Sequence, residues 1–342
     1  MSGAGATGVG SMPGTSFEEA QRVVLGELSP DVGAMPHLVE VPARGVAAGM
    51  VGRTLGLVTD LGADLQPAGW RLTGGPASAG VDHRRARSLL AQDLDVLEEL
   101  TEGYAGPLKV QVAGPWTLAA TVEKPRGDKV LADVGARRDL AQALAEGIGT
   151  HVRDVRRRVP GADRLVVQVD EPALAAVVGG RVPTASGFGK HRTIHPPEAS
   201  EALGWVLDAI AEQGAEPWVH SCAAGTPLEL VRGAGARGLS VDLDAVDAAG
   251  LDVLAEMLES GGSVALGVVP STDPTTPPGQ RQITERVLRW LDQLGLDPGM
   301  LPDGGSGLIV TPTCGLAGAT PGWARQALDL STATARHLRG GE

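Results

Sequence analysis

The stretch "RLVVQVDEPAL", Arg164 to Leu174, is a short run of mostly β-branched apolar residues that stops at two carboxylates and a proline. A run of this length is typical of a buried strand in a parallel sheet. Similar runs recur along the chain, separated by longer segments of helical period, which is the pattern of repeated βα units. Eight strands are predicted, at residues 6–11, 37–41, 108–114, 164–170, 217–221, 238–244, 263–269 and 307–313.

Amphipathic helices are predicted between these strands. Leu90, Leu94 and Leu97 recur at spacings of three and four residues, as do Leu140 and Leu144 in a later segment. Further helices are predicted at residues 17–27, 200–213, 248–260, 278–294 and 322–338.

Eight strands with intervening helices predict an α/β fold, a (β/α)8 TIM barrel that forms a single domain over residues 1–342. In such a barrel the functional site lies at the C-terminal ends of the strands. The long Gly-rich segments 41–84 and 177–197 are expected to be loops at this rim. Loops of that length inside a compact domain commonly serve as lids or binding loops.

Charge and cysteine content restrict the partner and the compartment. The net charge of −12 argues against nucleic acid or an anionic membrane surface as the main partner, so a small-molecule substrate is expected. No run of 18 apolar residues predicts a membrane span, and the first residues lack the pattern of a secretory leader. Two cysteines cannot form a disulfide framework and fit a reducing compartment. A cytoplasmic protein is therefore expected.

Residues able to bind a metal fall at the ends of three predicted strands. His220 and Cys222 close one strand, Asp242 and Asp244 close the next, and Cys314 closes the last. Zinc takes sulfur, nitrogen and oxygen ligands, and a catalytic zinc keeps one position open. The pattern predicts a zinc site built from His220, both cysteines and one carboxylate. The alternative is a pair of inert buried thiols beside a rim histidine.

Adjacent carboxylates, Asp170 and Glu171, follow another predicted strand. At a barrel rim they suit a substrate that carries an ammonium group, whereas an Asp before a helix can also act as its cap. The N-terminal "GAGATG" (Gly3 to Gly8) matches the spacing of a dinucleotide fingerprint, but that motif must follow a strand and open a helix. We therefore do not interpret it as a nucleotide site.

Several motifs in order resemble a known family. They cover nearly the whole chain and resemble the catalytic barrel of cobalamin-independent methionine synthase, in a short form that has only the C-terminal, zinc-bearing barrel. The resemblance implies a zinc-dependent methyltransferase that transfers a methyl group to the thiol of homocysteine and forms methionine. The motifs are "VGSMPG", "HLVEVPAR", "VQVAGPWTLA", "VQVDEPAL", "VHSC" and "VTPTCGLAGATPGWA".

The resemblance also implies the zinc ligands. His220, Cys222 and Cys314 occupy the positions of the family's histidine and cysteine ligands. The family has a glutamate at the end of the next strand, where "LSVD" places Asp242. The shorter side chain keeps an oxygen donor, and Asp244 is the fallback two residues on along the same face.

The homocysteine-binding positions of the family transfer in the same way. Val9 and Ser11 match the contacts to the substrate carboxylate, and Glu40 and Asp170 match the acidic partners of its ammonium group. Trp116 matches the region near the methyl donor. The alternatives are a turn for residues 9–11, surface or capping carboxylates, and a core tryptophan.

Two departures from the family leave the methyl donor open between a methylfolate and a methylcorrinoid, the latter carried by a corrinoid protein. The loop "GVVPSTDPT" (Gly267 to Thr275) lacks the histidine that the long enzymes carry there, and their first barrel is absent. The alternatives are a related methyltransferase that acts on another thiol such as coenzyme M, a non-catalytic zinc- or homocysteine-binding protein, and a purely structural barrel. No catalytic residue is predicted beyond the zinc site.

Overall fold

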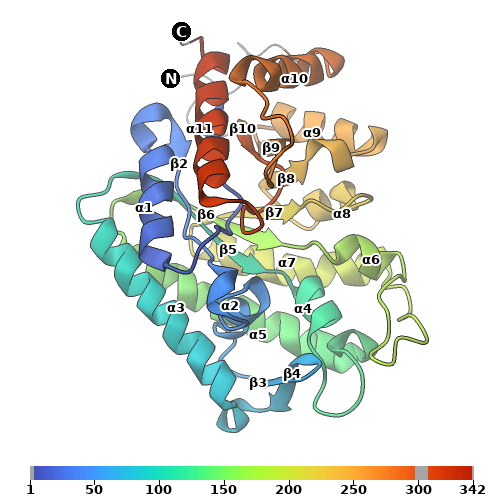
Figure 1. Cartoon of the computed structure of the whole chain (residues 1–342). Helices are drawn as coiled ribbons and strands as arrows, with labels where there is room; N and C mark the ends of the chain where they lie inside the picture. The colour runs from blue at the N-terminus through green and yellow to red at the C-terminus, as the bar shows by residue number, and fades with distance from the viewer. Residues whose placement is uncertain (1–3, 297–306, 341–342) are drawn as a thin grey trace.

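The computed structural model describes residues 4–296 and 307–340. Its main sheet is parallel and eight-stranded, and helices surround it (Figure 1). The strands are β1 (Gly5–Thr7), β2 (Ala34–Met35), β5 (Gly106–Ala113), β6 (Ala162–Asp170), β7 (Glu216–Ser221), β8 (Gly238–Asp242), β9 (Ser263–Val269) and β10 (Leu308–Pro312).

The sheet runs in the order β2-β1-β10-β9-β8-β7-β6-β5, and its two ends approach one another. The Lys109 amide donates to the Pro36 carbonyl at 2.9 Å, and the Leu38 amide donates to the Lys109 carbonyl at 2.9 Å. These bonds join the segment after β2 to β5. The protein is therefore a (β/α)8 barrel, as its sequence predicts.

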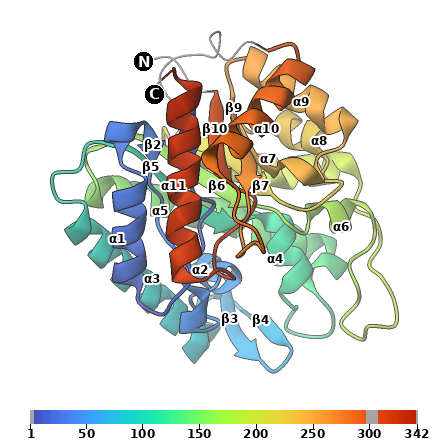
Figure 2. The same cartoon turned by 45° about the horizontal axis from the view of Figure 1, so that its top comes forward.

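The helices form the outer layer because each buries one apolar stripe against the sheet. On α3, Leu90, Leu94 and Leu97 are buried. Helices α1 and α11 lie side by side in both views and bring the first and last βα units together (Figures 1 and 2). The helices are α1 (Phe17–Glu27), α2 (Met50–Leu55), α3 (Val81–Leu100), α4 (Pro115–Thr121), α5 (Val134–Arg158), α6 (Leu174–Val178), α7 (Pro196–Glu212), α8 (Leu228–Gly233), α9 (Ala248–Glu259), α10 (Gln280–Gln293) and α11 (Pro321–Leu338).

The first two strands differ most from their predicted bounds. The strand predicted at 37–41 is displaced toward the N-terminus, since β2 covers Ala34–Met35, and β1 covers Gly5–Thr7 instead of 6–11. Beyond these short strands, the pairings continue as isolated bridges between Ser11 and Glu40 and between His37 and Lys109. Pro36 interrupts the second strand because it has no amide hydrogen to donate to a ladder.

The prediction that residues 41–84 are a long loop is wrong. This segment contains α2, an antiparallel hairpin of β3 (Gly62–Gln66) and β4 (Gly69–Gly74), and the start of α3. Trp70 and Leu72 alternate along β4 and are buried, as in a strand with one packed face. The second segment, 177–197, is mainly loop between α6 and α7, with one bridge between Pro183 and Lys190.

The interior of the barrel changes from apolar to polar toward the C-terminal ends of the strands. An apolar cluster of Met35, Val166, Trp218, Ala265 and Ile309 fills one layer. Along β6 from Val166, alternate positions bring the polar Gln168 and Asp170 toward the rim. Within the described ranges, no helix is both long and apolar enough to cross a membrane.

Candidate metal and substrate site

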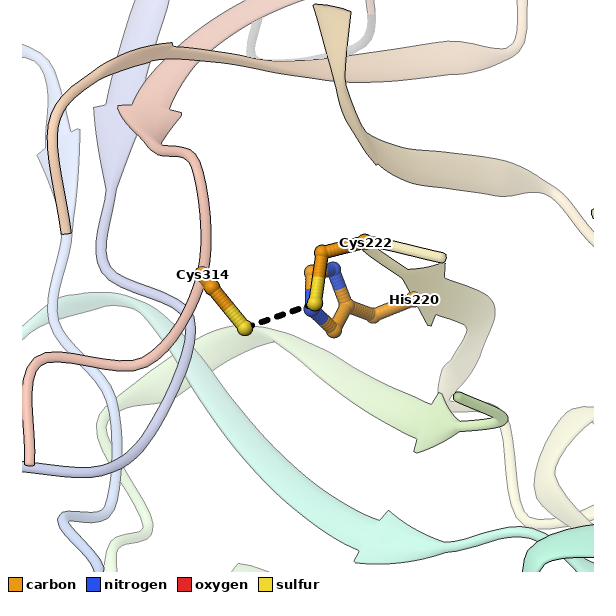
Figure 3. A group of neighbouring side chains, drawn as sticks. All are labelled: His220, Cys222 and Cys314. Atoms are coloured by element: carbon orange, nitrogen blue, oxygen red, sulfur yellow. Dashed lines mark hydrogen bonds between the residues drawn. The ribbon is translucent and has the colours of Figure 1, made fainter. Parts of the chain in front are cut away.

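Three side chains from two barrel strands meet at the C-terminal rim. His220 lies near the end of β7, Cys222 follows that strand, and Cys314 follows β10. Their ligand atoms lie within 4.8 Å of one another, and the two sulfurs are 2.7 Å apart (Figure 3). We call these three residues the donor group. Two zinc–sulfur bonds of about 2.3 Å at a tetrahedral angle would place the sulfurs about 3.8 Å apart, so the two sulfurs would have to separate to hold such an ion.

A hydrogen bond from His220 leaves one ring nitrogen available to a metal. Its Nδ1 lies 3.1 Å from the Ser240 carbonyl oxygen and 3.0 Å from the Ser240 hydroxyl. A carbonyl oxygen only accepts, so the bond to it requires the proton on Nδ1. Nε2 then carries the free lone pair, which is the arrangement that orients metal-binding histidines.

The hydrogen bond between the two thiols shifts their pKa values in opposite directions. The hydrogen bond from Cys222 lowers the pKa of Cys314 to about 4, and His220 lowers it further against the effect of burial. The same hydrogen bond, followed by burial, raises the pKa of Cys222. Cys314 is therefore the more acidic thiol of the pair, and the thiolate is the form in which a cysteine binds a metal.

The carboxylate expected to complete the zinc site lies outside the donor group. Asp242 ends β8, and its Oδ1 accepts the Asp244 amide at 3.1 Å, which caps a short 3-10 turn. Its charge still acts on the thiol of Cys222. Asp244 is exposed and pairs with Arg286. Of the two candidates, Asp242 is therefore the one electrostatically coupled to a cysteine.

A cavity of about 260 Å³ lies beside the donor group. Four residues predicted to bind substrate line it, namely Val9, Ser11, Glu40 and Asp170. Residues 9–11 reach it because β1 is the neighbour of β10: the Leu316 amide donates to the Ser11 carbonyl at 2.8 Å.

Glu40 and Asp170 give the cavity an acidic wall. Both are buried, and burial raises the pKa of Glu40 to about 7 and that of Asp170 to about 6. Arg53 opposes the shift at Glu40, with its Nε 4.0 Å from the carboxylate, and His220 opposes it at Asp170. Two buried carboxylates on one wall favour a ligand with a cationic group.

Trp116 and Glu171 belong to the packing around the cavity. Trp116 is 1% exposed, and its indole N–H donates to the Ala199 carbonyl at 2.9 Å. It does not line the cavity. Glu171 accepts the amides of Trp116 and Thr117, both at 2.8 Å, at the start of α4. Of the adjacent carboxylates after β6, Asp170 faces the cavity and Glu171 caps a helix.

A buried polar layer, not predicted from the sequence, lies beside the cavity. Lys109, Gln111 and Gln168 are all buried inside the barrel. Lys109 and Gln111 alternate with valines on β5, and Gln168 lies between Val167 and Val169 on β6. A lysine or glutamine flanked by valines in a strand buried on both faces is the signal that could have identified them, because such a side chain needs polar partners inside the protein.

Comparisons with known proteins identify the family of the chain. The family model described as the catalytic domain of the cobalamin-independent synthase matches residues 106–337, more than half of the chain. This range contains the donor group but not Val9, Ser11 or Glu40. No curated protein matches the sequence.

Among solved structures, a B12-independent methionine synthase from Shewanella sp. W3-18-1 in complex with selenomethionine is similar, with a TM-score of 0.60 and 14% identity over 98% of this chain and 97% of that chain. This structural similarity supports the (β/α)8 barrel fold. A 3-keto-D-glucoside 4-epimerase from E. coli has a TM-score of 0.38 and 11% identity over 74% of this chain and 86% of that chain.

Proposed function

The chain belongs to the cobalamin-independent synthase family, and from this premise we propose that it is a zinc-dependent methyltransferase that forms methionine from homocysteine. The observation that carries the proposal is the donor group of His220, Cys222 and Cys314 at the edge of a cavity with two buried carboxylates. One part of this site can hold a thiol-activating metal, and the other can hold an amino acid.

The donor group fits zinc by its chemistry. Two thiolates and an imidazole with Nδ1 already bonded are ligands that zinc prefers. We propose Asp242 as the oxygen donor, in exchange for its bond to the Asp244 amide. Zinc held by these residues would lower the pKa of a thiol, so that homocysteine would react as its thiolate.

The cavity orients the amino acid. Glu40 and Asp170 receive the ammonium group of homocysteine, while Val9 and Ser11 contact its carboxylate. With both ends of the amino acid held, the sulfur is directed toward the donor group. The protein thereby supplies proximity and orientation for attack on an activated methyl group.

The methyl donor is a methylfolate or a methylated corrinoid. The loop after β9 has a structural role, since Asp273 accepts the Thr320 amide at 2.7 Å and the Thr320 hydroxyl at 2.6 Å. The loop therefore anchors the start of α11. It also has no histidine that could protonate the folate leaving group. The free thiols suit a reducing compartment such as the cytoplasm.

The test is methionine formation by zinc-loaded protein given homocysteine and either methyltetrahydrofolate or methylcobalamin. We expect one zinc per chain and methionine from at least one donor. Cys314→Ser should lose both zinc and activity, whereas Ser221→Ala, between two zinc ligands, should keep both. Homocysteine binding without product from either donor would instead favour a non-catalytic binding protein.

A further inference from the structure

Lys109 lies inside the barrel without reaching the cavity. Its side chain projects from β5, is 0% exposed, and is absent from the cavity wall. Its Nζ donates to the Val9 carbonyl at 2.7 Å and to Gln168 Oε1 at 2.9 Å. A lysine is almost never fully buried unless it is paired, so its partners indicate its role.

Gln168 connects Lys109 to the cavity wall through hydrogen bonds. Because its Oε1 accepts from Lys109, its amide nitrogen must point the other way. That nitrogen donates to Asp170 Oδ1 at 2.7 Å and to the Val9 carbonyl at 2.9 Å. Lys109, Gln168 and the Val9 carbonyl therefore form a closed ring of hydrogen bonds, with one further bond to the Asp170 carboxylate.

Charged side chains lie around this ring of hydrogen bonds and act on the two buried carboxylates. Burial lowers the pKa of Lys109 to about 7, while the Asp170 and Glu40 carboxylates oppose that shift. Arg53 contributes on the Glu40 side only, at 4.0 Å. Asp170 accepts a hydrogen bond from Gln168, and His220 and then Lys109 are the cationic groups that oppose the rise of its pKa.

We propose that Lys109 and Gln168 are positioning residues that hold the Asp170 carboxylate toward the substrate's ammonium group, so that the site selects an amino-acid thiol over the same thiol without its amino group. This inference rests on the proposed function. Neither residue is catalytic. Lys109 fixes the direction of the Gln168 amide, and the Gln168 amide fixes Asp170.

We call the hydrogen-bonded path from Lys109 through Gln168 to Asp170 the relay. Two substitutions break it at different points, and both should cause the same loss of homocysteine affinity. Lys109→Met leaves Gln168 Oε1 without its donor, so the amide is free to turn its nitrogen away from Asp170. Gln168→Leu removes that nitrogen directly and leaves Lys109 in place. A shared defect from both variants indicates the relay and not a local packing change at either position.

The experiment is calorimetric binding of homocysteine and of 4-mercaptobutyrate, which is homocysteine without its amino group, to zinc-loaded protein. In both variants we expect homocysteine affinity to fall at least tenfold, 4-mercaptobutyrate affinity to stay within twofold, and zinc to stay at one per chain. Thr311→Val is the matched control, since this residue is buried on β10 and its hydroxyl has no hydrogen-bond partner within the described ranges. It should change neither affinity.

The possible results distinguish a failure of this inference from a failure of the proposed function. Equal weakening of both thiols would mean that the two residues only support the fold, and the inference would be overturned. Unchanged homocysteine affinity in Gln168→Leu would overturn it as well, even if Lys109→Met failed to fold. Wild-type protein that binds zinc but neither thiol would overturn the proposed function together with this inference.

Discussion

Asp242 has two competing roles at the level of the single residue. Its carboxylate caps a turn through the Asp244 amide, and the proposed zinc site needs the same group as a ligand. Asparagine can still accept the amide but offers no negative charge to a metal. We expect Asp242→Asn to lower zinc affinity at least tenfold with little change in stability. Zinc competition against a chromogenic chelator measures this.

The control for this prediction is Asp244→Asn. Asp244 is exposed and pairs with Arg286 on the outside of the barrel. Its substitution should leave zinc affinity unchanged. If Asp242→Asn and wild type bind zinc equally, the donor group holds the ion without this carboxylate.

Glu171 gives a prediction for the pH dependence of stability. Burial raises its pKa from 4.5 to about 7, despite hydrogen bonds from Trp116 and Thr117. A raised pKa in the folded state stabilises the protein below the unfolded pKa, and this contribution is lost as pH rises toward 7. Glu171→Gln resembles the protonated form, so its advantage over wild type should grow by at most about 3 kcal/mol between pH 4.5 and 7.5.

Urea unfolding at several pH values in this range measures the difference. The exposed Glu212→Gln is the control and should follow wild type at each pH. A constant difference between Glu171→Gln and wild type across the range would contradict the prediction.

At the scale of elements, the contact between β1 and the segment after β2 leaves no room for a side chain at Gly8. A Cβ atom there would lie 2.3 Å from the His37 ring. Gly8→Ala should therefore cost about 1–3 kcal/mol of the free energy of unfolding. The cost should shrink when His37 is also replaced by alanine, and a double-mutant cycle by urea unfolding measures this coupling.

Gly26 provides the matched control. It lies in α1, and a Cβ atom there would meet nothing within 4 Å. Gly26→Ala should be neutral or stabilise the helix by up to about 1 kcal/mol. Equal costs for Gly8→Ala with and without His37 would show that this close contact does not limit the packing.

The elements differ in how far their sequences predict them. Helix α1 was predicted at its observed bounds, and α9 to within one residue, because long amphipathic periods dominate such segments. The segment 41–84 was wrongly predicted to be a loop, because its elements are short and depend on tertiary contacts. Helix α2 is an example of such a short element. The cysteines and His220 were identified from strand ends and family resemblance. The relay through Lys109 depends on side-chain direction, which a sequence does not give.

At the scale of the molecule, metal binding should stabilise the fold because the donor group joins β7 to β10. A ligand at 100 times its Kd adds about 2.7 kcal/mol to the free energy of unfolding. Zinc should therefore raise the Tm by several degrees, and a chelator should reverse the rise. Differential scanning calorimetry measures it. The Cys222→Ser variant should show no shift, and a similar shift in that variant would place the stabilising ion elsewhere.

The position of β1 between β2 and β10 has a consequence for synthesis on the ribosome. The first strand to emerge waits for the last one, and until then β1 and β9 both expose unpaired backbone edges that invite association with other chains. Cys314 arrives with that final strand. The proposed metal could therefore bind only late in biogenesis, and a chain that ended before β10 could neither close the sheet nor complete the donor group.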